Sequence, residues 1–152
     1  MTEETIALPD AAATKAAGAA LAPLLRAGDV VALEGDLGAG KTSFARGVLA
    51  ALGLEGEAPS PTFAIVQPYA PPEVRLPVAH VDLYRIEEAE EAEELGLDEW
   101  LETGALLIEW PERLGAALPR HALRLRLEPA PGGGRRLTWR APAAWEGRWP
   151  PR

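Results

Sequence analysis

Short apolar runs alternate with stretches of helical spacing along this chain. Continuous apolar runs at Val30–Glu34 and Ala105–Glu109 are typical of strands that are buried on both faces of a parallel sheet. Apolar residues recur at helical spacing from Lys41 to Leu52, soon after the first of these runs. The pattern therefore predicts an α/β protein in which a helix follows a central strand.

Weaker signals predict the remaining elements. The further predicted strands are Thr5–Leu8, Thr62–Tyr69, Leu76–Tyr84, Leu123–Leu127 and Arg136–Arg140. The further predicted helices run from the N-cap Asp10 to about Arg26, from Glu87 to Leu95 and from Leu97 to Glu102. A proline turn separates Thr62–Tyr69 from Leu76–Tyr84, and a turn rich in proline and glycine separates Leu123–Leu127 from Arg136–Arg140. Each of these two pairs is therefore expected to be antiparallel.

Length and composition favour one compact domain. At 152 residues with 47% hydrophobic content, the chain can bury one core and has no room for two. We expect a single domain over residues 1–140. Residues 141–152 hold two tryptophans but also three prolines, and we expect them to form a loosely packed tail.

The charge balance and the lack of cysteine narrow the classes of function. A formal net charge of -8 argues against wrapping nucleic acid directly, so any RNA partner is expected to be reached through another protein. A chain without cysteine forms neither disulfides nor thiolate metal sites. Residues 1–9 carry acids where a secretory leader starts with basic residues, and no stretch approaches a membrane span. We expect a soluble, cytoplasmic protein.

The most informative motif is a phosphate loop. Residues Gly35–Thr42 read GDLGAGKT, which matches the pattern G-x-x-x-x-G-K-[ST] between a predicted strand and a predicted helix. The glycines let main-chain N–H groups face a phosphate, Lys41 reaches the outer phosphates, and Thr42 offers its hydroxyl to Mg²⁺. A simple helix-capping turn would not need the lysine and the hydroxyl. The sequence therefore predicts a nucleotide site.

Two acidic residues at the ends of apolar runs are candidates to complete this site. Glu109 ends its run where such folds place groups against a bound phosphate, and we predict that it supports Mg²⁺ directly or through water. Asp82 alternates with His80 and Tyr84, which are expected on the same face. Asp82 could orient or deprotonate the attacking water, or join the Mg²⁺ shell. For each acid the alternative is a solvated strand end or an arginine partner.

Two further segments are candidates for nucleotide contacts. Ser60–Phe63 follows the phosphate-loop helix, where nucleotide-sensing segments lie in such proteins, so Thr62 could contact Mg²⁺ or the terminal phosphate. The alternative is an ordinary turn in which proline fixes the backbone. Trp110 could stack near the nucleotide or belong to the core.

These elements predict an α/β, three-layer fold of the P-loop NTPase type. The central sheet is expected to be mixed and mostly parallel, with helices on both faces and an antiparallel hairpin at the C-terminal end.

Five sequence blocks, in order, resemble the TsaE family, formerly called YjeE. The blocks are Gly35–Thr42 followed by Phe44 and Arg46-Gly47, Ser60–Phe63, His80–Arg85, Glu94–Gly96 and Ile108–Pro111. The resemblance covers about residues 5–128. It implies a small P-loop ATPase that is required for making threonylcarbamoyladenosine in tRNA. Such a protein uses ATP with Mg²⁺, releases ADP, and acts on a complex of TsaD and TsaB, so that it reaches tRNA only through that complex.

The resemblance also implies roles for individual residues. The residues implied to bind ATP phosphates are Leu37, Gly38, Ala39, Gly40, Lys41, Thr42 and Ser43. Thr42 and Glu109 are implied to hold Mg²⁺, and Asp82 and Lys41 to be catalytic. The other implied nucleotide contacts are Thr62 in the switch segment, Trp110, and Thr14 near adenine. The family lacks an evident arginine finger, so hydrolysis by the isolated chain is expected to be slow.

Two functions from different classes stay open at this point. The first is an ATPase that drives the tRNA-modifying complex. The second is a nucleotide-gated binding module, in which ATP occupancy rather than hydrolysis controls the partner complex. A small-molecule kinase is a third reading, but the sequence offers no arginine-rich lid and little chain for an acceptor pocket.

Overall fold

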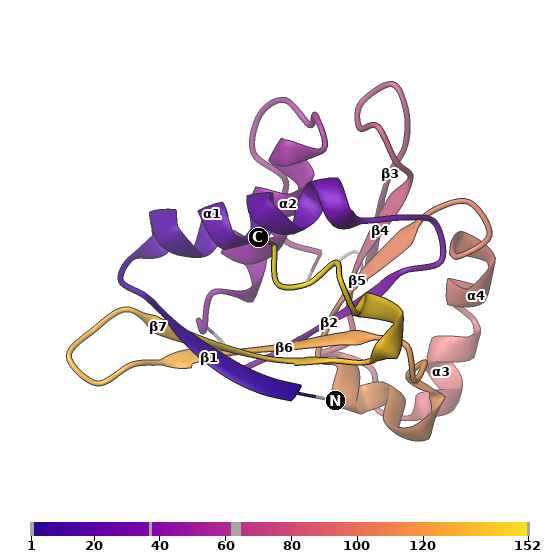
Figure 1. Ribbon diagram of the computed structural model, residues 1–152. Coiled ribbons are helices and arrows are strands. Elements are labelled where there is room, and N and C mark those ends of the chain that lie inside the picture. The colour runs from indigo at the N-terminus through magenta and orange to yellow at the C-terminus, as the bar shows by residue number, and fades with distance from the viewer. Residues whose placement is uncertain (1, 37, 62–64, 152) are drawn as a thin grey trace.

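The computed structural model of the protein describes residues 2–36, 38–61 and 65–151. Within these ranges seven strands form one sheet in the order β1-β7-β6-β2-β5-β4-β3 (Figure 1). The strands are β1 Thr2–Leu8, β2 Val30–Glu34, β3 Val66–Tyr69, β4 Val78–Asp82, β5 Ala105–Glu109, β6 Leu123–Pro129 and β7 Arg135–Ala141. The α-helices are α1 Ala11–Leu21, α2 Lys41–Ala51, α3 Ala89–Glu93 and α4 Leu97–Trp100, and the 3₁₀ helices are η1 Ala22–Leu24, η2 Pro111–Ala117 and η3 Ala143–Trp145.

The centre of the sheet is parallel and its edges are antiparallel. β2 lies parallel between β5 and β6, and β5 is also parallel to β4. β3 runs antiparallel to β4, and β7 pairs antiparallel with β6 and β1. The predicted mixed, mostly parallel sheet and its C-terminal hairpin are therefore confirmed. The parallel strands bring the carboxyl ends of β2, β4 and β5 to one edge, where binding sites of α/β folds are built.

Helices cover both faces of the sheet, as predicted. Alternate residues of β2 point to opposite faces, so Val31 and Leu33 pack into the core under α1 and α2. Val30 and Ala32 pack into a second core with residues of α3, α4 and η2. Figure 1 shows α1 and α2 together on one side of the sheet, away from α3 and α4. This burial on both faces explains why the strand is apolar at successive positions.

Two glycines let α1 and α2 approach each other backbone to backbone. A Cβ atom at Gly18 would lie 2.0 Å from the carbonyl oxygen of Phe44, and one at Gly47 would lie 2.0 Å from that of Lys15. No side chain fits at either position, so the contact requires glycine on both helices. The close crossing brings the N-terminal turn of α1 beside that of α2, which shapes the site described below.

Some element boundaries differ from the sequence predictions. The first helix ends at Leu21 rather than near Arg26, because Pro23 lacks an N–H group and the chain continues as the 3₁₀ turn η1. The acidic helix expected over Glu87–Leu95 is limited to α3. The 3₁₀ helix η2, which follows β5, was not predicted. No helix among the described residues is both long enough and apolar enough to cross a membrane.

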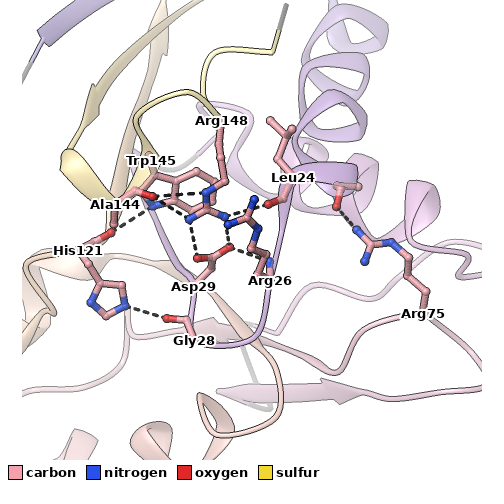
Figure 2. Close-up of polar contacts among 10 residues, drawn as sticks. Leu24, Arg26, Gly28, Asp29, Arg75, His121, Ala144, Trp145 and Arg148 are labelled. Carbon is pink, nitrogen blue, oxygen red and sulfur yellow. Dashed lines mark hydrogen bonds and ion pairs between the residues drawn. The ribbon is translucent and has the colours of Figure 1, made fainter.

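The C-terminal segment packs into the core instead of forming the loosely packed tail that its prolines suggested. Trp145 is fully buried and Trp149 is 7% exposed, and Trp149 meets Trp139 of β7 edge to face. Figure 2 shows Arg148 reaching Asp29, with two hydrogen bonds of 2.8 and 3.0 Å to its carboxylate. The indole of Trp145 donates to the carbonyl of His121. These contacts hold residues 145–149 against β7, against His121 before β6, and against the turn before β2.

Removing the Arg148 side chain is expected to destabilise the fold. The Arg148–Asp29 pair is nearly buried, with 12% and 9% of the two side chains exposed, and loss of one partner leaves the other charge without compensation. Arg148 also donates to the carbonyl of Leu24. We expect Arg148→Ala to lower the free energy of unfolding by about 3 kcal/mol in urea denaturation.

Arg140→Ala is the matched control for this prediction. Arg140 pairs with Glu3 at 3.2 Å, but both side chains are more than half exposed. Surface pairs of this kind contribute little, so the control is expected to change stability by less than about 1 kcal/mol. Equal losses in the two variants would contradict a structural role for the Arg148–Asp29 pair.

Candidate active site

The phosphate-loop motif lies between the end of β2 and the start of α2. Gly38 and Gly40 have φ angles of +78° and +106°, in the left-handed region that glycine adopts without strain. Gly40 is the N-cap of α2, and its carbonyl accepts from Phe44 as the helix begins. The first N–H groups of an α-helix have no partner within the helix and carry the positive end of its dipole. The sequence thus folds locally into a glycine turn at a helix N-terminus, an arrangement that favours negative charge.

A cavity of about 380 Å³ opens over this turn. Its lining residues come from the N-terminus of α1, the phosphate loop, the ends of β4 and β5, and the start of β7. They are Pro9, Asp10, Ala11, Thr14, Gly38, Ala39, Gly40, Lys41, Thr42, Ser43, Asp82, Glu109, Trp110, Gly134 and Arg135. The cavity therefore joins segments that are far apart in the sequence.

The structure brings ten of the twelve predicted site residues into this one cavity. Thr14 reaches it from α1, and Asp82 and Glu109 face it from the neighbouring strands β4 and β5. The other two, Leu37 and Thr62, lie outside the described residues, as does Phe63 of the proposed switch segment. The individual roles of all twelve residues stay predictions.

Lys41 carries a buried ammonium group that has no hydrogen-bond acceptor among the described residues. The residue is 4% exposed, and its Nζ lies 3.7 Å from the centroid of the Trp110 ring. Desolvation lowers the pKa of Lys41, although the carboxylates of Glu109 and Asp82 oppose this shift. A buried cation without acceptors is costly, and phosphate oxygens would supply them.

The lowered pKa of Lys41 predicts a pH dependence of stability. An unfolded lysine titrates near 10.5. Between the lowered pKa and that value the unfolded chain holds more protons at this site, so the unfolding free energy rises with pH. Below the lowered pKa the full penalty for the buried charge is present. We expect nucleotide-free Lys41→Met to be more stable than the wild type, and its advantage to shrink toward pH 10.5 in urea denaturation. If the stability difference between Lys41→Met and the wild type did not change with pH, the lowered pKa of Lys41 would be contradicted.

Glu109 is held between the phosphate loop and a buried histidine. The hydroxyl of Thr42 lies 3.5 Å from both carboxylate oxygens of Glu109. Nε2 of His80, which is fully buried on β4, lies 2.7 Å from Oε2 of the same carboxylate and fixes its orientation. His80 was predicted to share a face with Asp82, but its contact with Glu109 was not foreseen.

The oxygens of Thr42 and Glu109 fit a magnesium ion. Mg²⁺ prefers oxygen ligands and is usually held by one or two carboxylates together with substrate phosphates and water. The hydroxyl and the carboxylate converge in the cavity beside the phosphate loop, so these two residues would hold the ion there. Among the described residues no group of three or more His, Cys, Asp or Glu side chains forms a metal cage. The donor set thus suits an ion that arrives with a nucleotide.

Asp82, at the end of β4, and Trp110, directly after β5, line the same cavity. Asp82 is 4% exposed at the end of β4, and its Oδ1 accepts from the main-chain N–H of Tyr84 at 2.9 Å. Trp110 follows β5 with a φ of +61°, and its ring packs against Tyr84 at a centroid distance of 5.0 Å. Trp110 is partly exposed and lines the cavity, so it is more than a core residue.

One cationic residue of the cavity was not predicted from the sequence. Arg135, at the start of β7, donates to the carbonyls of Gly38 and Ala39 in the phosphate loop. No local motif surrounds it, and only the pairing of the C-terminal hairpin with β1 brings it to the site.

Comparison with known proteins gives consistent matches. The family model described as "Threonylcarbamoyl adenosine biosynthesis protein TsaE" matches residues 8–137. Relatives described as tRNA threonylcarbamoyladenosine biosynthesis protein TsaE include one from Bacillus subtilis, which is 40% identical over 84% of this chain and 79% of its own length. Another, from Streptomyces coelicolor, is 43% identical over 76% of this chain and 78% of its own length.

A solved structure has the same fold. The crystal structure of Bacillus subtilis YdiB superposes with a TM-score of 0.78 at 33% sequence identity. The superposition covers 92% of this chain and 86% of that one.

Proposed function

This chain belongs to the TsaE family of threonylcarbamoyladenosine biosynthesis, and from that premise we propose that it is the component of this machinery that binds and hydrolyses ATP. The observation that carries the proposal is the buried Lys41 ammonium, which follows a glycine-rich turn and has no hydrogen-bond acceptor within the described part of the chain. A triphosphate would supply the missing acceptors, and the N-terminus of α2 adds favourable charge.

The carboxylates suit the chemistry of phosphoryl transfer. Thr42 and Glu109 would hold Mg²⁺, which when bound neutralises charge that develops on the phosphates. Asp82 would accept a hydrogen bond from the attacking water, as a base or an orienting group, because it lines the cavity together with the phosphate loop. Lys41 would stabilise charge on the transferred phosphoryl group. ADP and inorganic phosphate would be the products.

Hydrolysis would be slow in the isolated chain and faster with its partners. Among the described residues the cations that line the cavity are Lys41 and Arg135, and the guanidinium of Arg135 already donates to three main-chain carbonyls. A partner could supply a further cation to the transition state. We propose that the partner is a complex of TsaD and TsaB in the cytoplasm, and that tRNA is met only through it. The net charge of -8 agrees with indirect contact to RNA.

A nucleotide-gated binding module is the alternative. In this case ATP occupancy would set the affinity for the partner complex, and hydrolysis would be incidental. Asp82 favours hydrolysis, because nucleotide occupancy alone does not need a second buried carboxylate in the cavity beside the one that would hold Mg²⁺.

The direct test is ATP binding and hydrolysis measured with the chain alone and with a TsaD–TsaB pair. We expect micromolar or tighter binding of ATP with Mg²⁺, slow turnover alone, and at least about tenfold stimulation by the pair. Absence of ATP binding would reject the nucleotide site itself. Binding without stimulation or complex formation would reject the proposed partner.

A further inference from the structure

Arg135 connects the C-terminal hairpin to the phosphate loop through a set of main-chain contacts. Its Nε donates to the carbonyl of Ala39 at 3.1 Å, and a terminal nitrogen donates to the carbonyl of Gly38 at 2.9 Å. The other terminal nitrogen donates at 3.0 Å to the carbonyl of Gly134, the residue that precedes Arg135. One guanidinium thus bridges two successive carbonyls of the loop from a residue almost a hundred positions away.

The backbone of Arg135 is held in the sheet by strands on both sides. Arg135 pairs with Leu8 of β1 on one side and with Pro129 of β6 on the other. The preceding Gly134 lies so close to β1 that a Cβ atom would be 2.7 Å from the carbonyl oxygen of Leu8. Because β7 lies between two strands, the side chain of Arg135 starts from a fixed point of the sheet.

The bridged carbonyls determine where the loop directs its N–H groups. In a trans peptide unit the C=O and the following N–H point in opposite directions. The N–H of Ala39, which follows the carbonyl of Gly38, is already bonded to the carbonyl of Asp36. Holding the carbonyl of Ala39 therefore fixes the N–H of Gly40 on the side away from the guanidinium.

We propose that Arg135 is a positioning residue that holds the phosphate loop in its nucleotide-binding shape before the nucleotide arrives. Glycines at positions 38 and 40 give the loop backbone freedom, which raises the entropic cost of ordering it around a ligand. The guanidinium, whose N–H groups form a planar fork, can bind two adjacent carbonyls at once and thereby remove part of that cost. This inference rests on the proposed nucleotide site.

Arg135→Lys separates this role from a simple effect of charge. The lysine keeps the positive charge but offers a single donor centre in place of the fork. Arg136→Gln is the matched control, because Arg136 is the next residue, pairs with Glu128 at the surface and does not line the cavity. Arg135→Gln serves as the variant that lacks the charge as well.

The test is calorimetric titration of each variant with ATP and with ADP in the presence of Mg²⁺, together with hydrogen exchange of the nucleotide-free proteins. We expect Arg135→Lys and Arg135→Gln to lower the affinity for both ATP and ADP by about tenfold or more, since either nucleotide would bind the ordered loop. Amides of the loop should exchange faster in both variants, whereas Arg136→Gln should match the wild type in both measurements.

Three outcomes would overturn the proposal. Wild-type behaviour of Arg135→Lys would show that the fork is not needed. A loss confined to ATP would indicate direct contact with the terminal phosphate, and unchanged loop exchange would show that the loop is ordered without the bridge. Failure of the wild type to bind either nucleotide would instead reject the proposed function, so the two failures are distinguishable.

Discussion

Lys41→Met is expected to abolish nucleotide binding while making the nucleotide-free protein more stable. The ammonium of Lys41 is buried, lacks a hydrogen-bond acceptor among the described residues, and contacts the face of Trp110. Without it the loop loses the charge that would meet the outer phosphates, so we expect ATP affinity and turnover to fall by at least about a hundredfold. Calorimetric titration and a phosphate-release assay measure these losses.

The gain in stability follows from the same burial. Methionine is close to lysine in length and needs no solvation, so its substitution removes a desolvation penalty. The contact with Trp110 and the nearby carboxylates offset part of that penalty in the wild type. We therefore expect a net gain of about 1 kcal/mol in the free energy of unfolding, measured in urea near neutral pH.

The chain offers a matched control for this substitution. Lys15 of α1, whose side chain is exposed, is the only other lysine in the sequence. Lys15→Met makes the same chemical change away from the cavity, and it should leave ATP affinity unchanged and alter stability by less than about 0.5 kcal/mol. If Lys41→Met kept its affinity for ATP, the assignment of the cavity to a nucleotide would be wrong.

Features of the fold that depend on local pattern could be predicted from the sequence. The bounds of β2 and β5 were predicted in full, because strands buried on both faces are apolar at successive positions. The first helix is shorter than its pattern predicts, because Pro23 lacks the N–H group that would continue the helical hydrogen bonds. Prolines favour a loosely packed tail over residues 141–152, whereas the structure packs this segment into the core. Its burial depends on Asp29, which is 119 positions from Arg148.

The candidate site also contains residues that the local sequence predicts and residues that only the arrangement of the strands brings to it. The phosphate loop is contiguous, and Asp82 and Glu109 each end a recognisable strand, so parallel pairing of β4 and β5 brings them together. The contact of His80 with Glu109 needed the register of those two strands, which one sequence does not reveal. Arg135 could not be found, because its place depends on three antiparallel strands at the edge of the sheet.

Asp82→Asn is expected to separate ATP binding from hydrolysis. Asparagine keeps an oxygen that can accept from the N–H of Tyr84, so the end of β4 should keep its shape. The substitution removes a negative charge from the cavity, and ATP affinity should therefore stay within about threefold of the wild type or improve. Turnover should fall by about a hundredfold or more, because the amide cannot take a proton from water.

The consequence for the partner complex decides between the two functions. If hydrolysis is the task, Asp82→Asn should support at most one round of threonylcarbamoyladenosine formation with a TsaD–TsaB pair and then stall, since the nucleotide is not turned over. Product per complex, measured on tRNA over time, shows whether the reaction stalls. Asp98→Asn, at an exposed position on α4, makes the same change away from the cavity and should sustain wild-type rounds. Repeated rounds with Asp82→Asn, despite its lost turnover, would favour the nucleotide-gated binding module instead.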